Sequence, residues 1–161
     1  MGLFSNLFLS PKMKILKESL DFNIGPYSLN KSISGIQGLK EVSKEEYDIF
    51  ERTFKNEKIY NGIPIKYEGH EWKVTIATVN NTIYKINIYL FTNNSNDFNN
   101  ISEDMLSFIE QNIGKADKGR YGNHQWISTA GNIILQAYNT EEGFYVGIFF
   151  TSSSVRNFES L

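Results

Sequence analysis

Two neighbouring stretches of the chain alternate apolar with polar or small residues, and this pattern constrains the fold more than any other. Such alternation places one kind of residue on each side of a β-strand. Between the stretches stands Asn80-Asn81, a pair that tolerates the left-handed backbone of a tight turn. The pattern predicts an antiparallel hairpin with one dry face. The stretches are 72–77, in which Trp72, Val74 and Ile76 share a face, and 84–91, in which Tyr84, Ile86, Ile88 and Leu90 lie opposite Lys85, Asn87, Tyr89 and Phe91.

A first amphipathic helix is predicted over residues 43–56. Ser43 and Glu46 form a capping box, in which the Ser43 hydroxyl accepts a hydrogen bond from a free helical amide and Glu46 reaches back. Apolar residues then recur at helical spacing. They are Tyr47, Phe50 and Phe54, and the acidic residues Glu45, Asp48 and Glu51 lie on the outer face.

A second amphipathic helix is predicted to open at Ser102 and to end at Gly114. Glu103 and Asp104 follow Ser102, where negative charge favours the positive end of the helix dipole. Gly114 accepts the backbone conformation that commonly ends a helix. Residues 92–100, which are rich in Asn, Ser, Thr and Asp, are predicted to form the preceding loop. The buried stripe consists of Met105, Leu106, Ile109 and Ile113.

Four further strands are predicted over residues 59–68, 126–129, 132–139 and 144–152. Pro64 lacks an amide donor, which predicts an edge position or a bulge in the first of them. Aromatic residues on both faces of the last strand are interpreted as core packing under the two helices. A helical turn capped by one of the serines at 152–154 follows. The order is helix, three strands, helix, three strands, which predicts an α+β fold in which two amphipathic helices pack on an antiparallel sheet of about five to seven strands.

The composition fits one globular domain, residues 1–161, and excludes several kinds of site. The chain has no cysteine, which excludes a disulfide framework, a thiolate metal site and a cysteine nucleophile. Its 16 basic and 18 acidic side chains give a net charge of -2, so nucleic acid is not an expected partner. We expect a cytoplasmic protein without a transmembrane segment, because no apolar run reaches the roughly 18 residues that a spanning helix needs.

Residues 1–12 are predicted to form an amphipathic segment. Leu3, Phe4, Leu7 and Phe8 would share one face of a short helical turn. Docking of this face on the domain is the simplest interpretation. Docking on a partner and a weak peripheral contact with a membrane surface are the alternatives.

The common motifs of catalysis and cofactor binding are absent from the sequence. It contains neither the GxGxxG and GxxxxGK fingerprints of nucleotide binding nor the GxSxG elbow of serine hydrolases. His70 stands between Glu68 and Glu71, but this spacing needs a further ligand from elsewhere to hold a metal. A surface turn is the better interpretation. We predict no cofactor, no metal site and no catalytic residues.

The densest cluster of polar and aromatic residues lies within 120–126. We predict that Arg120, Tyr121, His124 and Trp126 bind a partner. Arg, Tyr and Trp are enriched at binding hot spots, and loops at the end of a sheet often carry function. The alternative is a solvated basic loop in which Trp126 turns inward as the first core residue of its strand.

The preferred functional interpretation is a non-catalytic protein-binding domain, such as an inhibitor or an immunity-type partner of another protein. The acidic face of the first helix would suit a charge-complementary partner. The alternative is a small-molecule-binding protein or a minor enzyme with a pocket between the sheet and the helices, near His124 and Trp126. Protein binding predicts an exposed patch of roughly several hundred Å², whereas ligand binding predicts a concave, mostly apolar pocket with a few convergent polar groups.

Overall fold

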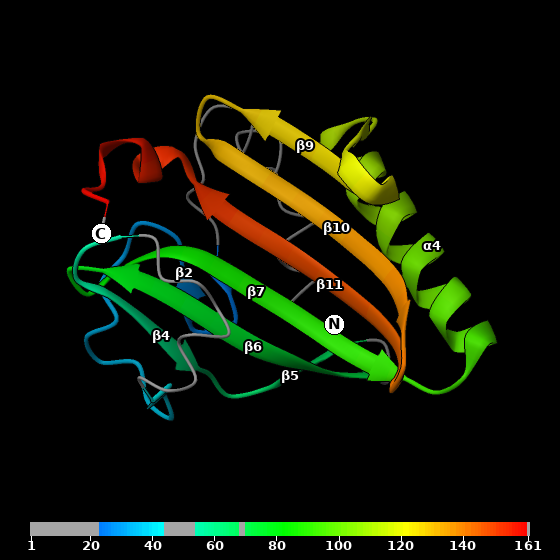
Figure 1. Ribbon diagram of the computed structural model, residues 1–161, viewed down its shortest axis with the longest axis horizontal. Coiled ribbons are helices and arrows are strands. Elements are labelled where there is room, and N and C mark those ends of the chain that lie inside the picture. The colour runs from blue at the N-terminus through cyan, green and yellow to red at the C-terminus, as the bar shows by residue number, and fades with distance from the viewer. Residues whose placement is uncertain (1–22, 44–53, 68–69, 161) are drawn as a thin grey trace.

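The described residues fold as a broad antiparallel sheet with a long α-helix along one of its faces (Figure 1). The structure is a computed structural model and describes residues 23–43, 54–67 and 70–160. Within these residues, nine strands form the main sheet, and two more form a separate small hairpin. No helix among these residues is both long and apolar enough to cross a membrane.

The main sheet has the strand order β3-β4-β6-β7-β11-β10-β9-β8, and β5 pairs with residues 70–72 of β6, which β4 does not reach. The central pair, β7 and β11, joins strands that lie far apart in the sequence and brings the two halves of the chain together. The elements are β1 (Asn23–Ile24), β2 (Tyr27–Ser28), β3 (Lys40–Glu41), β4 (Glu57–Asn61), β5 (Ile65–Tyr67), β6 (His70–Val79), β7 (Thr82–Thr92), α4 (Ser95–Ile113), β8 (Asp117–Lys118), β9 (His124–Ser128), β10 (Gly131–Thr140) and β11 (Gly143–Ser152), with 3-10 helices η1 (Arg120–Gly122) and η2 (Ser153–Asn157).

The predicted hairpin is confirmed as β6 and β7. Its turn residues Asn80 and Asn81 adopt φ values of 51° and 63°, the left-handed conformation that suits asparagine in a tight turn. The predicted side of Tyr84 is wrong, because the register shifts: Ala77 pairs with Lys85 and Thr78 with Ile83. Tyr84 is thus an extra, bulged residue on β7. Its side chain packs in the smaller cluster on one face of the sheet, whereas Ile86 packs in the larger cluster on the other face.

The strand predicted over residues 59–68 is interrupted at Pro64, as its missing amide donor indicated. β4 and β5 both pair with β6, at Ile59 with Ala77 and at Ile65 with Trp72, and the residues between them leave the ladder. The strands predicted over 126–129, 132–139 and 144–152 are confirmed as β9, β10 and β11. The final helical turn is η2, and the Ser152 side chain caps it by accepting from the Ser154 amide.

The start of α4 differs from its prediction. The helix begins at Ser95, so the loop predicted over 92–100 is wrong for most of its length. Asn94 provides the cap, because its Oδ1 accepts hydrogen bonds from the amides of Asn96 at 2.9 Å and Asp97 at 3.2 Å. The additional turns also gain packing, since Phe98 stacks on Phe144 with ring centroids 4.8 Å apart. The predicted end at Gly114 is confirmed.

The predicted order of two helices and two sets of three strands is wrong. In the described part of the chain, seven strands precede a single α-helix and four strands follow it, and the sheet has nine strands instead of five to seven. A strand as short as β3 has two residues, too few to show a period in the sequence. The helix predicted over 43–56 lies almost wholly outside the described residues, although Phe54 at its end forms an antiparallel bridge with Ser160.

The larger hydrophobic core lies between α4 and the sheet. The buried helix residues are Ile101, Met105, Ile109 and Ile113, and they share a cluster with strand residues that include Val74, Ile76, Ile86, Ile88, Leu90, Ile133, Leu135, Val146, Ile148 and Phe150. A smaller cluster covers part of the opposite sheet face. It contains Val42, Ile59, Ala77, Val79 and Tyr84, with Phe54, Val155 and Phe158 packed against them.

Candidate functional site

The four predicted binding residues lie around the start of β9 but do not form one surface. Arg120 and Tyr121 belong to η1, and Tyr121 is 99% exposed with a left-handed φ of 58°. His124 and Trp126 share one face of β9. Trp126 is 8% exposed, and its Nε1 donates to the Gly114 carbonyl at 2.9 Å. Trp126 is therefore the inward core residue of the alternative interpretation, while a binding role for the exposed residues stays a prediction.

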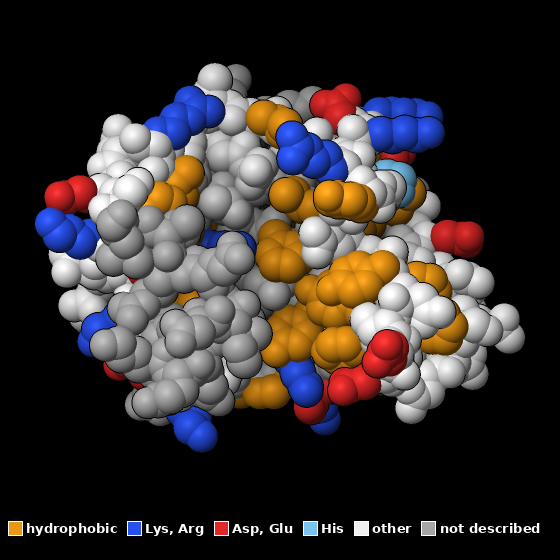
Figure 2. Space-filling view, in the orientation of Figure 1, with side chains coloured by type: hydrophobic (Ala, Val, Ile, Leu, Met, Phe, Trp, Pro, Cys, Tyr) orange, Lys and Arg blue, Asp and Glu red, His pale blue; other side chains and the backbone are white. Residues whose placement is uncertain are grey.

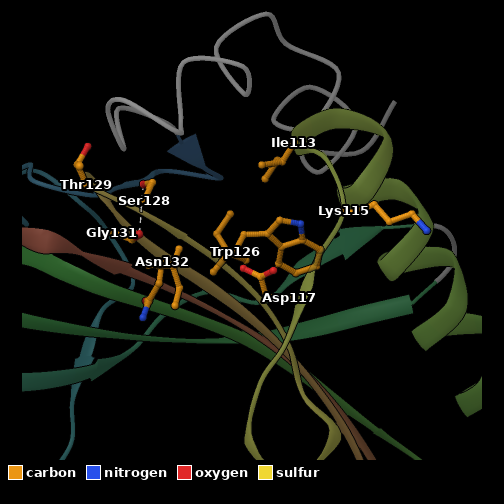
Figure 3. A pocket seen from close by; sticks show the side chains of 10 residues that line it. Ile113, Lys115, Asp117, Trp126, Ser128, Thr129, Gly131 and Asn132 are labelled. Atoms are coloured by element: carbon orange, nitrogen blue, oxygen red, sulfur yellow. Dashed lines mark hydrogen bonds between the residues drawn. The ribbon is translucent and has the colours of Figure 1, made fainter.

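A shallow pocket of about 340 Å³ lies beside Trp126, between the end of α4 and the β9–β10 turn (Figure 3). Of the four predicted residues, Trp126 lines it. The Asp117 carboxylate lies beside the indole in Figure 3, whereas the Lys115 side chain points away from it. Ser128 Oγ is engaged with the Gly131 carbonyl at 3.2 Å. Asn132 also lines the pocket, and its Oδ1 is buried without a hydrogen-bond partner among the described residues.

A larger cavity lies on the sheet face opposite α4, and we call it the aromatic cavity. Its volume is about 630 Å³. Figure 2 shows apolar side chains gathered on this face, over the part of the sheet formed by β7, β11 and β10. The described residues that line it are Glu57, Ile59, Thr75, Ile76, Ala77, Tyr84, Lys85, Asn87, Tyr89, Phe91, Tyr138, Tyr145 and Phe149.

Tyr145 is the centre of the aromatic wall. Strand pairing places it beside Phe91 of β7 and Tyr138 of β10, and their ring centroids lie 5.4 Å and 4.7 Å from its own. The Tyr89 ring also stacks on the Tyr145 ring, with the centroids 6.0 Å apart. The Tyr145 ring lies over the backbone of Gly147, where a Cβ would clash with the ring and its hydroxyl. A glycine at 147 is therefore what allows the ring to lie along the sheet.

The floor of the aromatic cavity is polar. Glu57 is only 5% exposed, and its carboxylate accepts a hydrogen bond from the Tyr84 hydroxyl. The Lys85 ammonium lies 5.2 Å from the centroid of the Phe149 ring, within range of a cation–π interaction. Asn87 Oδ1 is buried and has no hydrogen-bond partner among the described residues, while the amide of this side chain bonds to the Tyr145 hydroxyl.

Burial dominates the ionisation of these groups. It raises the pKa of Tyr145, with Tyr138 adding to the rise and Asn87 opposing it. It also raises the pKa of Tyr84, and the hydrogen bond to Glu57 raises it further. Burial lowers the pKa of Lys85, and the charge of Glu57 opposes that effect. Both tyrosines are consequently neutral hydrogen-bonding groups at neutral pH.

The sequence did not point to this cavity, because Tyr145 and Phe149 were predicted to pack under helices. α4 covers the other face of the sheet, and the helix predicted over 43–56 lies almost wholly outside the described residues. The alternation of Lys85, Asn87, Tyr89 and Phe91 was a usable signal. It could not identify β11 as the neighbouring strand, because pairing over such a sequence distance leaves no local pattern.

The lining of the aromatic cavity offers ring faces, a cation, a carboxylate and the amide of Asn87, a set that suits the binding of an organic molecule. No group of three or more His, Asp or Glu side chains within the described ranges could hold a metal ion. His70 and Trp72 line a separate groove beside α4. The chain matches no protein-family model, no curated protein and no solved structure.

Proposed function

We propose that this protein is a non-catalytic binding protein whose ligand is a small organic molecule held in the aromatic cavity. The observation that carries the proposal is the combination of a cavity of about 630 Å³, walls of aromatic rings, and a floor with several polar side chains. Pockets for small molecules typically measure about 300–1,000 Å³ and have this mixed lining. The pocket lies on the opposite side of the sheet from the predicted one.

The aromatic walls would supply affinity and the floor would supply orientation. Ring pairs contribute about 0.5–1.5 kcal/mol beyond the area that they bury, and Tyr89, Phe91 and Tyr145 present neighbouring rings to one space. A buried acceptor without a partner costs free energy. A ligand that donates to Asn87 Oδ1 would remove this cost.

The uncharged fluorescent probe N-phenyl-1-naphthylamine tests the proposal. We expect saturable binding at one site of the wild type, and roughly five- to tenfold weaker binding by Phe91→Ala, which removes one ring of the wall. Phe91 is 49% exposed, so this variant should fold. Tyr121→Ala is the matched control, because it removes an exposed ring outside the cavity. Absence of saturable binding, or equal affinity in Phe91→Ala and the wild type, would contradict the proposal.

Protein binding through the loop before β9 is the second candidate. The observation in its favour is Tyr121, a nearly fully exposed aromatic residue in a left-handed conformation, which non-glycine residues adopt at a cost and often at functional sites. The variant Arg120→Ala, Tyr121→Ala tests it without disturbing the core, unlike any substitution of Trp126. A stoichiometric protein partner should bind the wild type and not this variant.

A further inference from the structure

The aromatic cavity contains a cation that no described carboxylate neutralises at short range. Lys85 forms no ion pair within the described residues, where the ion pairs are Lys55–Glu159 and Lys58–Glu41. Its ammonium instead faces the Phe149 ring. Its neighbour Glu57 accepts a hydrogen bond from the Tyr84 hydroxyl, and the charge of Glu57 acts on Lys85.

A cation in this setting favours a particular kind of ligand. Desolvation of an ammonium group is costly unless a counter-charge or hydrogen bonds replace the lost water. An anionic group that enters the cavity would compensate Lys85, while a ring on the same molecule would contact the aromatic wall. Asn87 Oδ1, which has no hydrogen-bond partner among the described residues, offers a second polar atom of the floor to which a ligand could bind.

We infer that the ligand of the aromatic cavity is an aromatic anion, whose charged group binds the Lys85 ammonium and whose ring stacks within the wall around Tyr145. This inference rests on the proposed function and specifies the class of its ligand. Glu57 lowers the attraction between Lys85 and an anion, so the gain from the charged group should be moderate, roughly tenfold in affinity, at the lower end for hydrogen bonds to charged groups.

Two fluorescent probes that differ by one sulfonate test the inference. 1-Anilinonaphthalene-8-sulfonate carries the charge, and N-phenyl-1-naphthylamine has the same rings without it. We expect the sulfonate to bind the wild type roughly tenfold more tightly. Lys85→Met should remove this preference and leave the affinity for the uncharged probe nearly unchanged. Lys85→Gln replaces Lys85→Met if the latter does not fold by circular dichroism.

Lys73→Met is the matched control. Lys73 is exposed and pairs with Tyr89 across the strands, so it lies on the same sheet face without lining the cavity. Its substitution should preserve the preference for the sulfonate. Equal binding of the two probes to the wild type would overturn the inference and leave the proposed function intact, as would a preference that survives in the Lys85 variant. Failure of both probes to bind would overturn the inference and the proposed function together.

Discussion

At the scale of single residues, the candidate site depends on a few side chains that the strand pairing brings together. Tyr145 contacts three other aromatic rings and occupies the space that Gly147 leaves open. Trp126, the most prominent residue of the predicted site, instead secures the end of α4 through the Gly114 carbonyl. The type of a residue was therefore a poorer guide to the candidate site than the residues that lie beside it in the sheet.

Gly147→Ala should damage the cavity. The added methyl group would clash with the Tyr145 ring, and overpacking of this kind costs about 1–3 kcal/mol. Urea unfolding should show the loss of stability, and probe titration should show weaker binding. Gln136→Ala is the control, because Gln136 pairs with Gly147 across the strands and its truncation leaves the ring in place. Unchanged binding by Gly147→Ala would contradict the role of Tyr145 in the wall.

Alkaline pH should destabilise the protein through its buried tyrosines. Burial raises the pKa of Tyr84 and Tyr145 in the folded state, so above about pH 10 the unfolded chain loses protons that the folded chain retains. The stabilisation from each tyrosine is therefore fully present below about pH 10. Above that pH, the free energy of unfolding falls by up to about 1.4 kcal/mol per pH unit for each such group.

Tyr145→Phe isolates the contribution of one tyrosine. Urea unfolding at pH 9, 10 and 11 should show a shallower decline for this variant than for the wild type. Tyr121→Phe, which alters a fully exposed side chain, should keep the wild-type slope. A decline in Tyr145→Phe as steep as in the wild type would show that Tyr145 ionises normally in the folded protein.

At the scale of elements, α4 holds its position through a cap and a buried stripe. Asn94 caps the first turn, and four apolar residues at helical spacing enter the core. The sequence located the end of the helix and three of its four buried residues, but it included Leu106, which is only partly buried, and missed Ile101. It placed the start at Ser102, whose Oγ bonds to the Phe98 carbonyl at 2.7 Å inside the helix, as serine often does within helices.

Asn94→Ala should lower the free energy of unfolding by about 1 kcal/mol, because two amides of the first turn would lose their acceptor. Ser102→Ala should change it little, since the backbone carbonyl that Ser102 contacts already accepts within the helix. Thermal unfolding of the two variants compares the caps directly. A larger loss for Ser102→Ala than for Asn94→Ala would place the start of the helix at the predicted position.

At the scale of the whole molecule, one sheet separates two environments. One face packs against α4 and forms the larger core, and the other carries the aromatic cavity. The site lies on β7 and β11, the central strands that unite the two halves of the chain. Occupation of the cavity should therefore stabilise the fold as a unit.

A ligand that binds the folded chain alone should raise the unfolding temperature. At a concentration of about 100 times Kd the gain is about 2.7 kcal/mol, which corresponds to roughly 5–10 °C for a domain of this size. Thermal unfolding followed by circular dichroism with 1-anilinonaphthalene-8-sulfonate measures the shift. Phe91→Ala should show a smaller shift at the same probe concentration, and a decrease in the unfolding temperature of the wild type would indicate binding to the unfolded chain.

The features that could be predicted from the amino-acid sequence alone are those with local causes. The β6–β7 hairpin follows from alternation around Asn80 and Asn81, the last three strands follow from the same period, and α4 ends where Gly114 permits it. Turn-forming residues and hydrophobic periodicity act over a few neighbouring residues, so they can be recognised in one sequence. Three features became visible only in the folded chain: which strands are neighbours, which face α4 covers, and the bulge that moves Tyr84 to the other face. These features depend on contacts between residues that are distant in the sequence. The aromatic cavity forms only when those contacts have formed.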